Sequence, residues 1–136
     1  MSYLLDTNVV SELVRTRPDP AVVAWFDHVP DDSLYISVLT VGEIRKGIES
    51  VADGRRKETL RVWLEHTLPD WFEDRMLVID EAVAEQWGRL QAQAGRPLPA
   101  IDSLLAATAI QHDLRMVTRN EKDFSFPGLE VINPWH

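Results

Sequence analysis

The chain contains no cysteine, which excludes disulfide bonds, thiolate nucleophiles and zinc sites with cysteine ligands. Its four histidines, His28, His66, His112 and His136, lack the spacing of a metal site, and no glycine-rich phosphate loop is present. Long apolar runs are also missing. The stretch 104–110 is far too short to cross a bilayer, and the N-terminus lacks the features of a secretory signal. We therefore expect a cytoplasmic protein with no membrane contact.

Positive charge is in short supply: 14 Lys and Arg residues face 22 Asp and Glu residues, for a net charge of -8. Proteins that bind nucleic acids usually carry a basic surface, because neutralising phosphates supplies much of their affinity. A site made of carboxylates would add negative charge that divalent ions offset locally. The basic residues are also concentrated in one segment, at Arg45, Lys46, Arg55, Arg56, Lys57 and Arg61. That segment fits a nucleic-acid contact or a solvated helix face, so charge leaves both open.

The length of 136 residues and a hydrophobic content of 45% indicate a single folded domain spanning residues 1–136. Short apolar segments predict strands at 3–5, 34–39, 76–79, 115–118 and 129–132. Apolar residues at helical spacing predict helices near 9–14, 22–29, 40–51, 60–71, 80–94 and 99–112. Pro69 should kink or end the fourth of these helices. Strands that alternate with helices predict an α/β fold, a three-layer sandwich with a central parallel sheet of four to five strands flanked by helices.

Four acidic residues stand where such a fold gathers its ligands: Asp6, Glu43, Asp102 and Asp123. Asp6 follows the first strand directly, and Asp123 lies just beyond the strand at 115–118. Glu43 and Asp102 are expected in the first turns of their helices. Ligands of doubly wound sheets bind beyond the carboxyl ends of the strands, so we expect these acids to converge there. Ligand sets made only of oxygen suit Mg²⁺ or Mn²⁺.

Such a site fits the hydrolysis of a phosphodiester bond. An ion held by Asp6 and Asp102 would lower the pKa of a bound water and orient it for attack. Glu43 and Asp123 would complete the ligand shell or position the water. No covalent nucleophile is needed, which agrees with the absence of cysteine and of a recognisable serine–histidine pair.

Each acid also has a structural interpretation. Thr40-Val41-Gly42-Glu43 matches a capping box, and Asp102 could complement the dipole of its helix. Asp6 could cap a helix and Asp123 could belong to a surface turn. The tryptophans fall mostly on apolar helical faces, which favours core packing over base stacking, whereas Trp135, near the terminus, leaves both uses open.

A phosphoacceptor signalling domain would have a similar length, architecture and acidic pocket. Those domains usually carry paired acids after the first strand and a late lysine. Here Thr7-Asn8 follows Asp6, and the only late lysine is Lys122. The sequence therefore favours the metal-dependent nuclease over the phosphoacceptor.

Four segments of the chain, 3–12, 36–44, 101–109 and 117–124, resemble the VapC-type toxins of the PIN-domain family. The closing Asn133-Pro134-Trp135 is similar to the subgroup related to the trafficking regulator FitB. The resemblance implies a PIN-like sandwich and a Mg²⁺-dependent endoribonuclease in which Mn²⁺ can replace Mg²⁺. It also implies the toxin of a type II toxin–antitoxin pair, a homodimer that binds RNA as substrate, a cognate antitoxin as partner, and DNA only through that antitoxin.

Matched motif by motif, the resemblance implies that Asp6, Glu43, Asp102 and Asp123 are the catalytic acids and that Asp6 and Asp102 hold the metal. Relatives differ at the fourth position, where some carry an acid in place of Asn120. We favour Asp123, with Asn120 as a neutral supporting ligand. The alternative function is a catalytically weak PIN-like module that binds or regulates together with a DNA-binding antitoxin.

Overall fold

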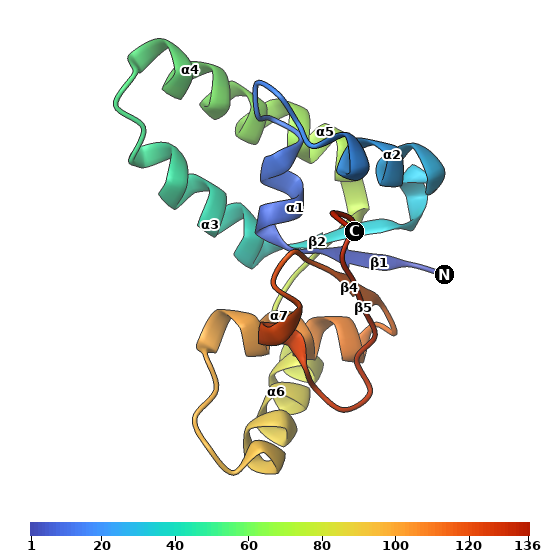
Figure 1. Cartoon of the computed structure of the whole chain (residues 1–136). Helices are drawn as coiled ribbons and strands as arrows, with labels where there is room; N and C mark the ends of the chain where they lie inside the picture. The colour runs from blue at the N-terminus through green and yellow to red at the C-terminus, as the bar shows by residue number, and fades with distance from the viewer.

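The computed structural model describes residues 1–136 and places five strands in one sheet (Figure 1). The strands are β1 (Tyr3–Leu5), β2 (Leu34–Ser37), β3 (Met76–Leu77), β4 (Arg115–Val117) and β5 (Val131–Ile132). Their order across the sheet is β3-β2-β1-β4-β5, and every neighbouring pair is parallel. The predicted parallel sheet is confirmed.

Helices cover both faces of the sheet (Figure 1). Helices α1 (Thr7–Glu12), α2 (Pro20–His28), α3 (Val38–Glu49), α4 (Gly54–Val62) and α5 (Leu68–Phe72) lie on one side. Helices α6 (Glu81–Ala94) and α7 (Ala100–Gln111) lie on the other. Short 3-10 helices span Asp31–Ser33, Glu73–Arg75 and Glu121–Phe124, and a π-helical turn spans Trp63–Thr67. The chain thus forms the predicted three-layer sandwich.

The central strand β1 is buried on both faces. Tyr3 and Leu5 pack into the hydrophobic cluster under α1–α5, whereas Leu4 packs into the cluster under α6 and α7. Neighbouring side chains of a strand point to opposite faces, so an uninterrupted apolar strand fits a sheet covered on both sides. In β4, Val117 and Met116 divide between the two clusters in the same way.

The direction in which successive strands are added to the sheet reverses between β1 and β4. The chain runs outward from β1 through β2 to β3, and then returns to the other side of β1 to form β4. Asp6 follows β1 and Thr118 follows β4, so both lie at the carboxyl ends of the two strands that flank this switch point. The backbone N–H of Asp6 donates to the carbonyl oxygen of Val117 at 2.9 Å. The fold therefore places Asp6 where ligands of such sheets bind.

Helix α3 corrects one sequence-based expectation. It begins at Val38 instead of Thr40, because Ser37 at the end of β2 accepts a hydrogen bond from the backbone N–H of Leu39 at 3.0 Å and caps the helix. Thr40 therefore lies inside the helix, where its buried hydroxyl has no hydrogen-bond partner. The capping-box interpretation of Glu43 is wrong, and Glu43 lies in the second turn of the helix.

Strand bounds and the effect of Pro69 also differ from expectation. Strands β2, β3, β4 and β5 are each shorter than predicted, and β2 ends at Ser37 because α3 begins at the next residue. Pro69 neither ends the helical segment nor interrupts it sharply. The segment widens into the π-helical turn just before Pro69, where the N–H of Leu68 donates to the carbonyl of Trp63.

Candidate active site

Asp6 is the most enclosed of the four predicted acids, with 6% of its surface exposed. Its Oδ1 accepts a hydrogen bond from the backbone N–H of Thr7 at 2.8 Å, which caps the short helix α1. Its Oδ2 accepts one from the Thr118 hydroxyl at 2.7 Å. No lysine or arginine pairs with Asp6 among the ion pairs of the chain. A buried carboxylate without a cation is costly to maintain, so this placement calls for a compensating charge.

Glu43 is tied to the same edge of the sheet by Thr7. The Thr7 hydroxyl donates to Glu43 Oε1 at 2.6 Å, a contact between the start of α1 and the second turn of α3. Thr7 thus links two acids, through its backbone to Asp6 and through its side chain to Glu43. This bond fixes Glu43 next to Asp6 although 37 positions separate them in sequence.

Asp102 and Asp123 belong to other elements, α7 on the opposite face of the sheet and the 3-10 helix after β4. Asp102 lies in the first turn of α7, as predicted, and is partly buried without a hydrogen bond that lowers its pKa. Asp123 lies in the 3-10 helix after β4 and is exposed. The loop that carries it is anchored near Asp6, because the backbone N–H of Asn120 donates to the Thr118 hydroxyl at 3.0 Å.

Burial and the charges of neighbouring acids raise the pKa values of Asp6 and Asp102. Burial, together with the negative charges of Asp6, Asp123 and Glu43, raises the pKa of Asp102 to about 6. Burial also raises the pKa of Asp6, and the charges of Glu43 and Asp123 add to the rise. The hydrogen bonds from Thr118 and Thr7 partly oppose it. The structure thus brings the predicted acids into one electrostatic neighbourhood with no basic partner.

The carboxylates do not converge into a ready-made cage. No three Asp, Glu, His or Cys side chains stand close enough to hold a metal ion together. Carboxylate oxygens are nevertheless the donors that suit Mg²⁺, an ion that usually keeps several waters and takes only one or two protein carboxylates. The donor set therefore fits a hydrated divalent cation that the chain would hold through few direct ligands.

Sequence reasoning missed the two threonines that position the acids. Thr7 directly follows the predicted acid Asp6, and Thr118 lies at the end of a predicted strand, so the sequence does contain a signal for each residue. A hydroxyl at the end of a strand can orient a neighbouring carboxylate without adding charge. Both residues belong to the site as positioning groups.

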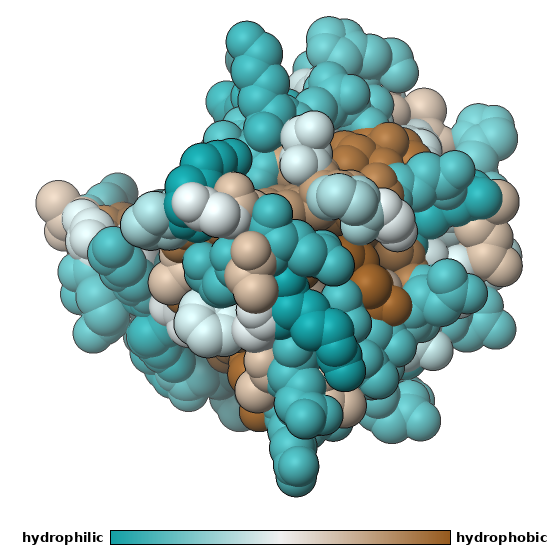
Figure 2. Space-filling model, turned by 90° about the horizontal axis from the view of Figure 1, so that it is seen from below, coloured by the Kyte–Doolittle hydropathy of each residue, from teal (hydrophilic) through white to brown (hydrophobic).

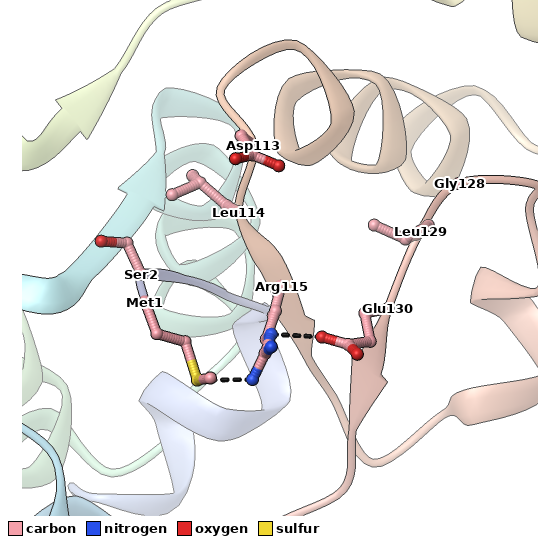
Figure 3. Close-up of a pocket in the computed structure, with 8 residues that line it drawn as sticks. All are labelled: Met1, Ser2, Asp113, Leu114, Arg115, Gly128, Leu129 and Glu130. Carbon is pink, nitrogen blue, oxygen red and sulfur yellow. Dashed lines mark hydrogen bonds and ion pairs between the residues drawn. The ribbon is translucent and has the colours of Figure 1, made fainter.

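A hollow of about 540 Å³ lies at the opposite edge of the sheet (Figure 3). Met1 and Ser2 precede β1 there, and Arg115 at the start of β4 forms an ion pair with Glu130 before β5. These are the amino ends of the strands, away from the acids. Because parallel sheets bind their ligands at the carboxyl ends, this hollow is no candidate for the active site.

The surface seen from the side of α6 and α7 is mainly hydrophilic, with apolar atoms showing in limited areas (Figure 2). Few large apolar side chains of the whole chain are exposed, namely Met1, Val23, Val62, Val78 and Ile101. None of the helices combines the length and the apolar character needed to span a bilayer.

Comparisons with known proteins agree with this architecture. Residues 3–126 match the PIN domain. The chain is 39% identical to toxin FitB of Neisseria gonorrhoeae over 136 residues, which cover 98% of each chain. It is 37% identical to VapC ribonuclease Y4jK of Sinorhizobium fredii over 135 residues, which cover 97% of this chain and 96% of the relative.

Solved structures give the same answer. The crystal structure of FitAcB from Neisseria gonorrhoeae superposes with a TM-score of 0.90 at 38% identity, covering 98% of this chain and 99% of that one. The structure of FitAB bound to an IR36 DNA fragment superposes with a TM-score of 0.88 at 36% identity, covering 98% and 96%. The chain belongs to the PIN-domain family, in the branch that contains toxin FitB and VapC ribonuclease.

Proposed function

We propose that the chain is a Mg²⁺-dependent endoribonuclease and the toxin of a type II toxin–antitoxin pair, in which Mn²⁺ can replace Mg²⁺. One observation carries the proposal: Asp6 is buried at the switch point of the sheet without a lysine or arginine partner, and burial and neighbouring acids raise the pKa values of Asp6 and Asp102. Relatives named VapC ribonuclease and toxin FitB support the assignment of RNA as substrate and of the biological role.

Asp6 and Asp102 would hold the ion. Both have pKa values raised chiefly by burial, so a bound cation would relieve the cost of keeping both ionised. When bound, the ion supplies a Lewis acid that lowers the pKa of water and stabilises charge on phosphoryl oxygens. The hydrogen bonds from Thr7 and Thr118 leave the Asp6 carboxylate in one orientation, which prepares it for a ligand of fixed geometry.

Glu43 would accept the proton of the attacking water, and Asp123 would orient the water or the substrate. Oε1 of Glu43 accepts the Thr7 hydroxyl, which leaves Oε2 without a hydrogen bond and available to accept a proton from water. Asp123 is exposed and lies on a loop anchored to Thr118, where it can orient water or substrate at the rim. We favour Asp123 over Asn120 as the fourth acid, because Asp123 contributes charge that both Asp6 and Asp102 sense.

The proposed partners follow from relatives. The structure of FitAB bound to a DNA fragment supports a pairing of this chain with an antitoxin, and we propose that the antitoxin makes the DNA contacts. We also propose a homodimer, and RNA as the nucleic acid that reaches the acids directly.

The test is cleavage of labelled RNA and of DNA of the same sequence, after chelation and after return of Mg²⁺ or Mn²⁺. We expect RNA cleavage that requires the ion, and a loss of at least about 100-fold in Asp6→Asn and Asp102→Asn with the fold retained by circular dichroism. Equal cleavage by wild type and both variants would refute the mechanism. A wild-type chain that binds an antitoxin but cuts no RNA would favour the alternative, a catalytically weak PIN-like regulatory module.

A further inference from the structure

A second hollow, of about 570 Å³, opens beside Asp123. Residues that follow β4 and β5 form most of its wall: Arg119, Asn120, Glu121, Lys122, Asp123, Asn133, Trp135 and His136, with Asp19 from the start of α2. These segments extend from the carboxyl ends of two neighbouring strands. The hollow therefore adjoins the acidic site and shares Asp123 with it.

Trp135 lines this hollow, and its aromatic ring is fixed by several contacts. The guanidinium carbon of Arg119 lies 5.1 Å from the centroid of the Trp135 ring, a cation–π contact. The backbone N–H of Trp135 donates to Asn133 Oδ1 at 2.9 Å, and Asn133 Nδ2 in turn donates to Glu121 Oε2 at 3.1 Å. The partly buried indole also packs against the hydrophobic cluster under α1–α5. Ring and guanidinium are thus held in place before any ligand arrives.

The hollow is coupled in position to the acids through the loop after β4. The backbone N–H of Arg119 donates to Asn8 Oδ1 at 3.4 Å. The next residue, Asn120, bonds the Thr118 hydroxyl, which donates to Asp6 Oδ2. A group seated against Arg119 and Trp135 would therefore have a fixed position relative to Asp6.

The charge of the wall selects among occupants. Arg119 and Lys122 provide two positive charges, whereas Asp19, Glu121 and Asp123 provide three negative ones. This balance disfavours a phosphate. A neutral, planar group with hydrogen-bonding edges fits better, because the wall offers both donors and acceptors. Bases of single-stranded RNA stack on aromatic rings and guanidinium planes and are recognised at their edges in this way.

We propose that this hollow binds a nucleobase of the RNA close to the cleaved bond, with Trp135 and Arg119 as the stacking platform. The proposal rests on the proposed ribonuclease function and adds a site that sets affinity and base preference. Trp135 takes no part in the chemistry. On a chain with net charge -8, stacking supplies affinity that phosphate contacts supply in basic proteins.

The experiment compares wild type with Trp135→Leu and Trp135→Phe on a short oligoribonucleotide. We expect Trp135→Leu to raise KM about tenfold and leave kcat within about twofold, since stacking acts on binding. Trp135→Phe keeps an aromatic face and should lie close to wild type. The ratio of KM values should stay constant between low and high salt, because stacking releases few counterions. Thermal unfolding of each variant checks that the fold is retained.

An abasic scan identifies the base. Each oligoribonucleotide carries one abasic ribose, at a different position in each. Wild type should bind more weakly to only one of them, the one that lacks the base held in the hollow. Trp135→Leu should bind that RNA as well as it binds intact RNA. The proposal would be overturned if Trp135→Leu left KM unchanged, or if it weakened binding of intact and abasic RNA by the same factor. A protein partner would then be the remaining occupant. If the wild type cleaves no RNA, the proposed function fails, and fluorescence anisotropy in EDTA tests the hollow separately. Equal RNA affinity of wild type and Trp135→Leu in that measurement would overturn the proposal that the hollow binds a nucleobase.

Discussion

Replacing Asp102 with asparagine should stabilise the metal-free fold while it abolishes cleavage. The pKa of Asp102 is raised from 3.8 to about 6 by burial and by the charges of Asp6, Asp123 and Glu43. Between these two values the folded chain binds more protons than the unfolded chain, so stability falls as the pH rises through this window. Above pH 6 the full cost of ionising Asp102 in the fold is present. Asparagine keeps the shape and removes this cost.

The size of the effect follows from the pKa shift. A rise of about two units corresponds to roughly 3 kcal/mol when each unit is worth about 1.4 kcal/mol. Asp102 is only partly buried, and solvent screening reduces this to about 1–2 kcal/mol. For a chain of this size such a gain raises Tm by about 3–8 °C.

The assay is thermal unfolding in EDTA at pH 4 and pH 8, with wild type, Asp102→Asn and Asp27→Asn. Asp27 is an exposed acid on α2, so its substitution controls for the loss of one negative charge. We expect Asp102→Asn to exceed wild type at pH 8 and to match it near pH 4. Added Mg²⁺ should raise the Tm of wild type only, because the variant lacks a ligand. Equal Tm values at pH 8, or an equal gain in Asp27→Asn, would refute the reasoning.

Three further substitutions test the hydroxyl groups of the site and of α3. Thr7→Val removes the hydrogen bond to Glu43 and should lower cleavage about tenfold, with activity retained in Thr7→Ser, as measured by initial rates. Thr118→Val removes a bond that lowers the pKa of Asp6, so the acid limb of the pH–rate profile should move to higher pH; an unchanged limb would contradict this. Thr40→Val replaces a buried hydroxyl without a partner and should raise the free energy of unfolding in urea by about 1 kcal/mol, whereas a decrease would indicate an unseen partner.

The layered fold could be predicted from the sequence because its signals are local. Each strand is a short apolar run, and Tyr3, Leu4 and Leu5 alternate between two cores as an enclosed strand requires. The start of α3 could not be predicted, because Ser37 and Thr40 are both good caps. Only the path of the chain out of β2 decides between them.

The places of Asp6 and Asp102 in the fold could be predicted from the sequence, but the contacts of the acids could not. Asp6 and Asp102 follow from their places after a strand and in a first turn. The bond between Thr7 and Glu43 joins two helices, and the local capping pattern at Thr40 pointed to a different partner. The hollow beside Asp123 was hidden for a similar reason, since Trp135 and Arg119 meet only once β4 and β5 pair.

The order of strands has a consequence for synthesis of the protein. The central strand β1 is made first, yet its neighbour β4 is made only after residue 114. Until then the Asp6 carboxylate lacks the Thr118 hydroxyl, and α7 has no completed sheet to pack upon. A growing chain, or a fragment cut before β4, therefore has no assembled acidic centre. The candidate site would form only when nearly the whole polypeptide is available to fold.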